Sequence, residues 1–305
     1  MFPTEQCNFR CTYCYEDFKL KRMSPEVIKG IKLLISKRVT NLNKLILSWF
    51  GGEPLVAKDI VLDISKYAFD ISKRNPSLLY QGAMSTNGYL LTGKLFSELV
   101  KLGLNSYQIS IDGPHEVHNQ TRRRIDGKGT FERIWSNLLE IRDSELQANI
   151  VLRLHLTQSN ILAMESLINN IEYEFGSSKM FSVFFKPVEK LGGGNDNNLN
   201  VISTKDQPSI IRELKSKLKN VRCSNFEEND MSVCYAAKPN SLAIRSDGSL
   251  SKCTVALREQ KNHIGKINSD GTLEINHQKL APWLRGFENM DKNVLGCPLI
   301  NFPTS

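Results

Sequence analysis

The sequence contains few histidines and no long apolar run. Only 5 of its 305 residues are histidine, and no stretch approaches the roughly 18 consecutive apolar residues of a transmembrane helix. The first residues, MFPTEQC, have neither the basic segment nor the apolar segment of a secretory signal. We therefore expect a cytoplasmic protein with no membrane partner.

Low-complexity runs are also absent, although 24% of the residues are charged and the net charge is +8. A chain that is 40% hydrophobic and this long buries a large core. The basic residues are scattered except at Arg122 to Arg124, and the aromatic interleaving of nucleic-acid-binding surfaces is missing. Nucleic acid is therefore not an expected partner, whereas a basic surface would attract an acidic peptide.

Short β-rich runs alternate with helical patterns between about residues 40 and 190. Strands are predicted at 45–50, 82–88, 106–113, 149–157 and 181–188, and helices at 58–74, 92–103, 129–144 and 160–175. This order predicts an α/β fold with a parallel sheet covered by helices. Ligands of such sheets bind at the carboxyl ends of the strands.

The glycine-rich segment 192–198 predicts a flexible loop or a domain edge. After it, the alternation of strands and helices gives way to a different pattern. A helix is predicted at 209–220, and two hairpins with Ser-Asp-Gly turns are predicted at 240–253 and 263–275. We therefore expect three parts, which are a core at 1–190, a linker and helix at 191–230, and a small β-rich domain at 231–305.

Three of the seven cysteines stand close together, as Cys7-x3-Cys11-x2-Cys14. In a cytosolic chain this pattern predicts metal ligation rather than disulfides. Thiolates suit zinc or an iron–sulfur cluster. A closed structural site needs four protein ligands, and no histidine or fourth cysteine follows nearby. Three thiolates suit three irons of a 4Fe–4S cluster whose fourth iron stays open, with zinc as the alternative.

The segment CNFRCTYCY, with Tyr13 before the last cysteine, resembles the CxxxCxΦC signature of the radical SAM superfamily, and in particular its branch that acts on peptides and proteins. The resemblance implies a partial, open (β/α)6 barrel in which Cys7, Cys11 and Cys14 hold a 4Fe–4S cluster. It also implies that the open iron binds S-adenosylmethionine, whose reductive cleavage gives a 5′-deoxyadenosyl radical that abstracts a substrate hydrogen.

Further motifs follow in the order that the family has. FGGEP at 50–54 resembles the motif that binds the ammonium group of S-adenosylmethionine, which assigns this role to Gly51, Gly52 and Glu53. The two glycines also allow a ligand to approach the backbone closely. STNG resembles the family's next strand edge and adds Asn87 as a candidate contact.

SIDG resembles the family's contacts to ribose and carboxylate, through Ser110 and Asp112. The loop that follows has Asn119 where the family usually has an aspartate. An arginine of this loop often holds the methionine carboxylate by bidentate pairing. Arg122 and Arg124 are both candidates, with a solvated surface as the alternative for the spare arginine.

RLHLTQSN resembles a family strand whose arginine approaches the cosubstrate, which makes Arg153 a candidate contact. A buried structural ion is the alternative for this residue. His155, on the same strand between two leucines, is expected to be a satisfied core histidine.

The C-terminal cysteines resemble those of SPASM and Twitch extensions, which carry auxiliary iron–sulfur clusters. Cys234-x13-Gly248-x4-Cys253 fits their signature, but Val294 and Pro303 stand where a full SPASM domain has cysteines. We expect one auxiliary cluster on the four remaining cysteines, Cys223, Cys234, Cys253 and Cys297. The alternative is a set of free, buried cysteines.

The resemblance implies an oxidoreductase-type maturase of a ribosomally made peptide (RiPP) or protein, acting by crosslinking or epimerisation. Anaerobic sulfatase maturation is one alternative, and a non-catalytic zinc or peptide-binding module is another. Expected partners are the substrate, a separate leader-peptide-binding protein, and an electron donor such as flavodoxin or ferredoxin. The family normally has a strand before the cysteine loop, and only six residues precede Cys7, so we expect a chain shortened at both ends.

Overall fold

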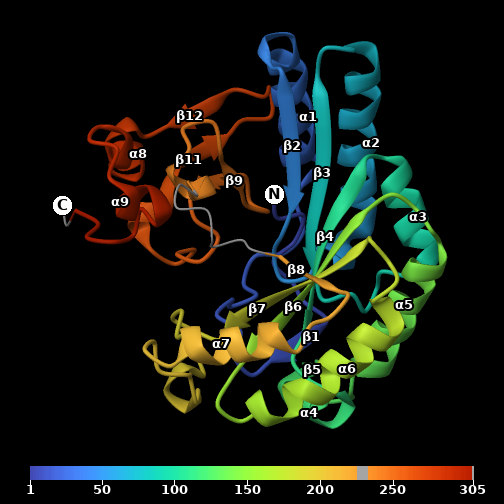
Figure 1. The fold of residues 1–305 in the computed structure, drawn as a ribbon. Coiled ribbons are helices and arrows are strands. Elements are labelled where there is room, and N and C mark those ends of the chain that lie inside the picture. The colour runs from blue at the N-terminus through green and yellow to red at the C-terminus, as the bar shows by residue number, and fades with distance from the viewer. Residues whose placement is uncertain (225–232, 304–305) are drawn as a thin grey trace.

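A parallel sheet forms the centre of the chain in the computed structural model, which describes residues 1–224 and 233–303. Figure 1 shows the sheet curving into a partial barrel, with strand order β2-β3-β4-β6-β7-β8. These strands are β2 Lys44–Trp49, β3 Leu79–Thr86, β4 Leu104–Ile111, β6 Asn149–Leu156, β7 Phe181–Pro187 and β8 Arg222–Cys223. All of their pairings are parallel, which confirms the predicted α/β partial barrel.

Helices cover the outer face of this sheet, as Figure 1 shows for α1, α2, α3, α5, α6 and α7. The helices are α1 Pro25–Arg38, α2 Lys58–Arg74, α3 Gly93–Lys101, α4 His115–Thr121, α5 Phe131–Asp143, α6 Met164–Phe175, α7 Gln207–Ser216, α8 His277–Leu284 and α9 Lys292–Gly296. The helix predicted at 58–74 has the bounds of α2. The helix α1 was not predicted, although Ser24 caps its first turn by accepting from Val27 N.

Local sequence explains why the strands and helices have these partners. Along β7 the buried positions alternate, because one side of the strand faces the barrel interior and the other faces the helices. The helix α2 buries a stripe that contains Ile60, Ile64 and Ala68 against the sheet. Thr92 begins α3 by accepting a hydrogen bond from Leu95 N at 3.3 Å.

The sixth strand of the sheet lies within residues 191–230, the predicted linker and helix. The short strand β8 pairs with β7 through Ser182↔Arg222 and Val183↔Cys223. The helix α7 precedes it, so this segment adds one helix and one strand to the barrel. The division of the chain into domains stays a prediction.

The C-terminal part is a small antiparallel sheet with two helices beside the barrel (Figure 1). Its strands are β9 Ala243–Ile244, β10 Ser249–Ser251, β11 His263–Ile267 and β12 Leu273–Ile275, which confirm both predicted hairpins. It packs tightly on α1, because a Cβ added to Gly30 would lie 2.4 Å from Asn268 O. The hydrophobic core is continuous between the two parts. In the parts of the chain that are described, no helix has the length and apolar character needed to cross a membrane.

Candidate active site

A short strand pairing sets the shape of the amino-terminal cysteine loop. The strand β1 (Phe9–Cys11) pairs antiparallel with β5 (Arg122–Arg124), which places Cys11 opposite Arg122. The Cys14 N–H then donates to Cys11 O at 3.2 Å and closes a turn. The cysteine loop is therefore held by a segment that is distant in the sequence, so cysteine spacing alone does not determine its geometry.

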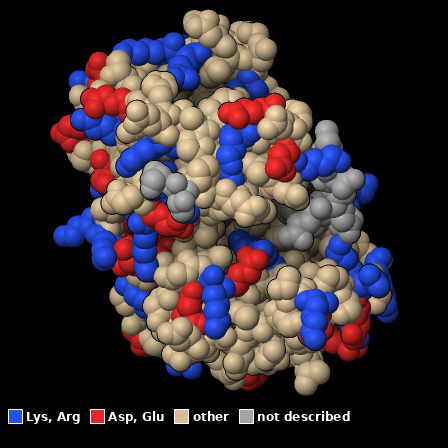
Figure 2. All heavy atoms as spheres, turned by 90° about the vertical axis from the view of Figure 1, so that its left-hand side faces the viewer, with Lys and Arg blue, Asp and Glu red and all other residues tan. Residues whose placement is uncertain are grey.

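The three amino-terminal thiols line one cavity of about 180 Å³. The rest of its wall comes mainly from residues at the carboxyl ends of β3, β4, β6 and β7. This is the end of a parallel sheet at which ligands bind. Figure 2 shows that the molecule is hollowed near the middle of the face that it displays, with charged side chains of both signs around the hollow.

Burial raises the pKa of all three thiols. For Cys14 burial is the largest cause and raises the pKa to about 12, and burial also raises the pKa of Cys7. For Cys11 the charge of Arg122 opposes the effect of burial without cancelling it. These thiols therefore keep their protons at neutral pH until a metal displaces them.

The three thiols fit an iron–sulfur cluster better than a single metal ion. A zinc site brings every ligand sulfur to within about 2.3 Å of one ion. Within residues 1–224 and 233–303, no group of three or more His, Cys, Asp or Glu side chains is arranged to hold one ion. Thiols spread around a shared cavity provide soft ligands for a group with several iron atoms.

Tyr13 joins the cysteine loop to the barrel strands. Its hydroxyl donates to Asp112 Oδ1 at 2.9 Å and accepts from Arg122 Nη1 at 2.6 Å. The ring lies 4.9 Å from that of His155, whose Nδ1 is 3.1 Å from the Tyr13 hydroxyl. Burial would raise the pKa of Asp112, but the bond to His155 and the charge of Arg122 hold it well below its usual range. The aspartate is therefore an anion that neutralises the buried arginine.

His155 is a buried member of this network and also lines the cavity. Burial is the main cause that lowers its pKa to about 4, against the raising effect of its bond to Asp112. The imidazole is therefore neutral at pH 7. Its Nδ1 is hydrogen-bonded and its side chain is buried, as the sequence predicts, and the residue also lines the cavity.

Glu53 holds together the two loops that follow β2 and β3. Its Oε1 accepts from Leu55 N at 3.0 Å and Thr86 Oγ1 at 2.8 Å, and its Oε2 accepts from Asn87 N at 2.7 Å. The side chain is fully buried and is not among the residues that line the cavity. The carboxylate therefore positions the loop, while the backbone of Gly51 and Gly52 faces the cavity.

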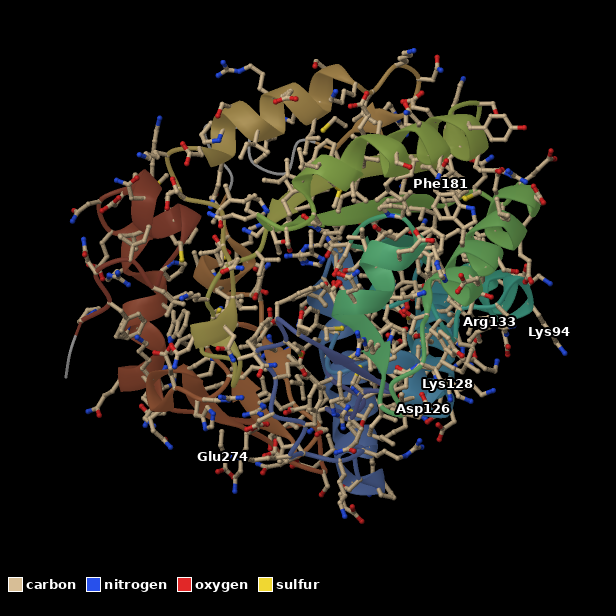
Figure 3. The ribbon with its side chains drawn as sticks, turned by 90° about the horizontal axis from the view of Figure 1, so that it is seen from below. Lys94, Asp126, Lys128, Arg133, Phe181 and Glu274 are labelled. Carbon is tan, nitrogen blue, oxygen red and sulfur yellow. The ribbon has the colours of Figure 1, made fainter. Side chains whose placement is uncertain are left out.

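The two candidate arginines of β5 have different surroundings. Arg122 is 6% exposed and lines the cavity, and its Nε is buried without a hydrogen-bond partner among the described residues. Arg124 instead donates to the Tyr89 hydroxyl at 3.0 Å and pairs with Asp126 at 2.8 Å. Figure 3 shows Asp126 at the periphery of the molecule. The geometry therefore favours Arg122 as the ligand-binding arginine.

Most of the predicted cofactor contacts lie around the same cavity. Those that line it are Tyr13, Gly51, Gly52, Asn87, Ser110, Arg122 and Arg153. Glu53, Asp112 and Arg124 are not among the lining residues. Arg153 resembles Arg122, because its buried Nε also has no hydrogen-bond partner in the described part of the chain. The contacts of these residues with a cofactor stay predictions.

Sequence reasoning missed several residues of the cavity wall. Ser85 and Gln108 lie on strands that were predicted, and they are 3.5 Å apart between Ser85 Oγ and Gln108 Oε1. Lys186 and Glu189 line the cavity from the end of β7, where the strand-end rule would have placed them. Glu16 follows the last cysteine of the loop and carried no motif that would have singled it out.

The glycine-rich segment 192–198 packs against the cysteine loop. Asn195 Nδ2 donates to Thr12 O at 3.1 Å, and a Cβ on Gly193 would lie 2.6 Å from Cys14 O. Arg258, from the C-terminal part, donates to Gly192 O at 2.9 Å and to Tyr15 O at 3.0 Å. Instead of a free flexible loop, this segment therefore connects the cysteine loop with the C-terminal part.

Three of the C-terminal cysteines form a second group. The charges of Cys253 and Cys297 contribute to raising the pKa of Cys234, although burial is the larger cause. Asn262 shapes the turn at Cys253, because its Oδ1 accepts from Cys253 N at 2.9 Å and its Nδ2 donates to Cys253 O at 2.8 Å. Cys223 lies on β8 of the barrel sheet, and its membership of a four-cysteine set stays a prediction.

Comparisons with known proteins place the chain in a family. The radical SAM superfamily profile matches residues 1–168, which is more than half of the chain. The chain is 27% identical over 275 residues to the molybdenum cofactor biosynthesis protein moc-5 of Caenorhabditis elegans, covering 82% of this chain and 42% of that protein. It is 26% identical over 191 residues to a serine-type anaerobic sulfatase-maturating enzyme of Bacteroides thetaiotaomicron, covering 60% and 41%.

A GTP 3′,8-cyclase of Aliarcobacter butzleri is 31% identical over 163 residues, which cover 48% of this chain and 43% of that enzyme. The aligned regions span less than half the length of these three curated relatives.

Solved structures share the fold. The enzyme anSMEcpe with bound AdoMet and a Kp18Cys peptide superposes with a TM-score of 0.68 at 18% identity, covering 92% of this chain and 82% of that one. Streptococcus suis SuiB bound to its precursor peptide SuiA superposes with a TM-score of 0.65 at 15% identity, covering 93% and 63%. Together with the profile match, these similarities show that the chain belongs to the radical SAM superfamily, whose enzymes use a 4Fe–4S cluster and S-adenosylmethionine.

Proposed function

We propose that this chain cleaves S-adenosylmethionine reductively and uses the resulting radical to modify a peptide or protein, by crosslinking or epimerisation. The observation that carries the proposal is the convergence of three thiols and two arginines with buried Nε atoms on one cavity at the carboxyl ends of the strands. The similarity in fold to two proteins solved with peptides, over 92% and 93% of this chain, supports a peptide substrate.

Cys7, Cys11 and Cys14 would hold the catalytic cluster as three thiolates, once metal binding has displaced their protons. When bound and reduced, this cluster supplies the electron that splits S-adenosylmethionine into methionine and a 5′-deoxyadenosyl radical. The protein contributes a cavity lined by the cysteine loop and the strand ends, which limits the access of water to such a reactive group. The hydrogen bond from Tyr13 to Asp112, which follows β4, holds the cysteine loop against the barrel.

The guanidinium groups of Arg122 and Arg153, whose Nε atoms lack a partner among the described residues, suit the carboxylate of S-adenosylmethionine. Arg122 and Arg153 each have a buried Nε without a hydrogen-bond partner in the described residues. A guanidinium can bind a carboxylate through two parallel N–H donors, and an unpaired buried donor is costly until a ligand fills it. The backbone of Gly51 and Gly52 leaves room for the rest of the methionine group.

An auxiliary cluster in the C-terminal part would relay an electron or bind substrate. Cys234, Cys253 and Cys297 would supply three of its ligands, since the charges of Cys253 and Cys297 both act on Cys234. Cys223 is the proposed fourth ligand. The hydrogen bonds from Arg258 to Gly192 O and Tyr15 O would then connect the residues around one cluster with those around the other.

Sulfatase maturation is a second candidate, because the chain is similar to a sulfatase-maturating enzyme over 60% of its length. The GTP 3′,8-cyclase relative gives a nucleotide as a competing substrate class. These substrate classes can be separated by incubating the same enzyme preparation with candidate peptides, with a sulfatase fragment and with GTP, and by measuring each product by mass spectrometry.

Anaerobic reconstitution tests the cofactor part of the proposal directly. We expect about four irons per chain from the amino-terminal cluster and about eight if the auxiliary cluster also forms. Addition of dithionite and S-adenosylmethionine should then yield 5′-deoxyadenosine. The triple variant C7S/C11S/C14S should lose about four irons and all of this product. A zinc-filled site, or wild-type protein that forms no 5′-deoxyadenosine, would overturn the proposal and favour a binding module.

The substrate is tested separately with short peptides encoded beside the gene. A peptide that loses two hydrogens or exchanges its α-hydrogen with solvent, only when S-adenosylmethionine is present, supports the proposed class. Conversion of a sulfatase serine or cysteine would instead establish the second candidate. Turnover of GTP alone would contradict both peptide-based functions.

A further inference from the structure

The two faces of the β1–β5 ribbon carry different side chains. Phe9 and Cys11, which flank Arg10, line the cavity of the three thiols, and so does Arg122, which precedes Arg123. Neither Arg10 nor Arg123 lines it. Since successive residues of a strand point to opposite sides, these two arginines lie on the outer face of the ribbon. One layer of backbone separates that face from the Cys11 thiol.

The two arginines of the outer face stand directly opposite each other, because the strand pairing sets Arg10 against Arg123. Both are exposed. Arg10 donates to two backbone carbonyls of the cysteine loop, and its guanidinium lies 4.2 Å from the ring centre of Phe18. Arg123 donates to Asn119 O at 3.0 Å. Neither arginine forms an ion pair within the described parts of the chain. Like charges at opposing positions of a strand pair repel each other, so an anionic partner would stabilise this arrangement.

The other charges of the ribbon and of the adjoining loop leave this positive charge in place. Asp126 pairs with Arg124 at 2.8 Å, and Asp17 pairs with Lys19 at 3.4 Å. Lys128 is exposed and has no ion pair among the residues that the structure describes. It therefore adds a further cation at the end of the ribbon.

The neighbouring helices do not neutralise the ribbon either. They contribute Glu116, Glu132 and Arg133, and both carboxylates contact His115. Even with an uncharged His115, the three unpaired cations of the ribbon together with Arg133 outnumber the two carboxylates. The net charge of the whole chain, +8, also attracts an anionic partner.

An exposed apolar residue belongs to the same face. Ile125 is 64% exposed and lies two positions after Arg123, so both point to the same side. Its N–H donates to Asn8 O at 2.9 Å and extends the strand pairing. Figure 1 shows β5 on the side of the barrel away from the small C-terminal sheet, which leaves this face uncovered by that part. An apolar contact with charges around it suits a protein partner of opposite charge.

The position of this face indicates which acidic partner it suits. The proposed chemistry consumes one electron for each S-adenosylmethionine that is cleaved, so an outside reductant must approach the cysteine loop repeatedly. A peptide substrate has to enter the cavity on the inner side of the ribbon. A reductant only has to come close to the cysteine ligands, and the outer face lies across one ribbon from Cys11. The outer face is therefore better suited to a reductant than to the substrate.

We propose that the outer ribbon face, formed by Arg10, Arg123 and Ile125, docks an acidic protein that donates single electrons. The donor loses one electron and the cluster held by the cysteine loop gains it, while no bond is made or broken and no proton moves. The inference rests on the proposed function, because it requires a reducible cluster at the amino-terminal cysteines. It deepens that function by naming the class of electron donor and its binding surface.

The first test measures the binding of oxidised flavodoxin, an acidic flavin protein that carries single electrons, to the iron-loaded full chain by anaerobic titration calorimetry. We expect binding whose affinity falls at least tenfold between about 50 mM and about 300 mM NaCl, because salt screens exposed charges. Binding that is absent or insensitive to salt would overturn the proposal, and this measurement needs no variant.

Charge reversal assigns the binding to the two arginines. Arg10→Glu/Arg123→Glu should bind flavodoxin at least tenfold more weakly than the wild type. Arg10→Lys/Arg123→Lys keeps the charge but not the guanidinium hydrogen bonds, and should stay within about threefold of the wild type. The matched control, Arg74→Glu/Lys101→Glu, reverses two exposed charges at the ends of α2 and α3 and should change the affinity less than twofold.

Two outcomes of this series contradict the proposal. Equal losses in the lysine and glutamate variants would show that the arginines only support the structure of the loop. An equal loss in the matched control would show that flavodoxin responds to net charge and not to this face.

The second test follows reduction of the cluster by stopped-flow absorbance. Reduced flavodoxin, below saturation, should reduce the glutamate variant at least tenfold more slowly than the wild type. Reduced methyl viologen, a small cation that needs no docking face, should reduce the variant at least half as fast as the wild type. Equal slowing with both reductants would mean a disturbed cysteine loop and would overturn the assignment. Weaker flavodoxin binding with an unchanged reduction rate would mean that the face serves another acidic partner, such as a peptide, and would overturn it too.

The proposed function fails by a different observation. If flavodoxin docks and reduces the protein as described but no 5′-deoxyadenosine forms, the docking face stands and the proposed radical chemistry is wrong. If 5′-deoxyadenosine forms with dithionite while flavodoxin ignores the two arginines, the radical chemistry stands and the docking proposal is wrong.

Discussion

Arg122 donates a hydrogen bond of 2.6 Å to the hydroxyl of Tyr13, the aromatic residue that precedes the last cysteine of the amino-terminal loop. The same arginine lies opposite Cys11 in the β1–β5 pairing. One buried cation therefore contacts the aromatic residue of the motif and lies beside Cys11. The position of the cysteine loop depends on this guanidinium, and the proposed recognition of the cosubstrate carboxylate would depend on it as well.

Arg122→Lys should weaken S-adenosylmethionine binding about tenfold, which corresponds to about 1.4 kcal/mol. A lysine ammonium cannot keep the bond to Tyr13 and also offer a planar pair of donors to a carboxylate. Anaerobic calorimetry on iron-loaded protein measures this affinity. Arg124→Lys, two positions away and paired with Asp126, should change it less than twofold, and equal losses in the two variants would contradict the assignment of Arg122.

Glu53→Gln should lower the free energy of unfolding by about 1–3 kcal/mol. Both carboxylate oxygens accept hydrogen bonds from the protein, and the new amide would turn an N–H group toward one of those donors. Urea denaturation measures the loss. Glu140→Gln is the control, because Glu140 accepts from Gly93 N at an exposed position. If both variants lose the same small amount, Glu53 does not hold the loops together.

Gly52→Ala should displace the cysteine loop and destabilise the fold by about 1–3 kcal/mol. The added methyl group would lie 2.5 Å from Gln6 O and 2.6 Å from Glu5 O, and backbone atoms cannot give way as a flexible side chain does. Thermal unfolding and the number of irons bound after reconstitution are the measurements. Gly194→Ala, where a methyl group meets nothing within 4 Å, should behave like the wild type.

His118 should make the protein sensitive to mild acid. Burial is the main cause that lowers its folded-state pKa to about 3. Its Nδ1 accepts from Asp112 N, and its Nε2 contacts Thr130 Oγ1. Because the unfolded pKa is higher, at about 6.5, the contribution of His118 is complete above that pH and is lost as the pH falls. Between pH 7.5 and 5.5 this group should cost about 1.4 kcal/mol.

Urea denaturation at the two pH values measures this effect of His118. The variant His118→Gln should lose about 1.4 kcal/mol less than the wild type over the same interval. Parallel pH dependence in the two proteins would show that other groups cause the acid sensitivity.

Serine replacements should divide the cysteines into two independent groups. C234S/C253S/C297S should retain about four irons and the formation of 5′-deoxyadenosine, although substrate modification should be lost. Cys223→Ser alone decides whether Cys223 is the fourth ligand, since it should lower the iron content toward about four if it is. Unchanged iron content in the triple variant would exclude an auxiliary cluster at these cysteines.

Much of the barrel could be predicted because its strands and helices are encoded locally. The period of apolar residues in 58–74 gave the helix α2 with the correct bounds, and the Ser-Asp-Gly turns gave both hairpins. The pairing of β1 with β5 was not predicted. It joins two strands of three residues each from distant parts of the chain, and strands this short carry no periodic signal.

Within the candidate site, sequence predicted residues that belong to recognisable motifs and missed the others. The motif residues Gly52 and Ser110 line the cavity, but Glu53 turns inward to bind backbone groups. Sequence showed no preference between Arg122 and Arg124, because residues two apart point to the same side of a strand, and what each side chain meets depends on the folded neighbours. Glu16 was missed because no motif includes it, and its place in the cavity wall is a property of the folded protein only.

The hydrogen bond from Arg258 to Tyr15 O can form only after most of the chain has been synthesised. The carbonyl belongs to the start of the chain, and the guanidinium is made 243 positions later. The β1–β5 pairing that sets the shape of the cysteine loop needs only the first 124 residues. The contact from Arg258 is therefore added to a loop that already has its main support.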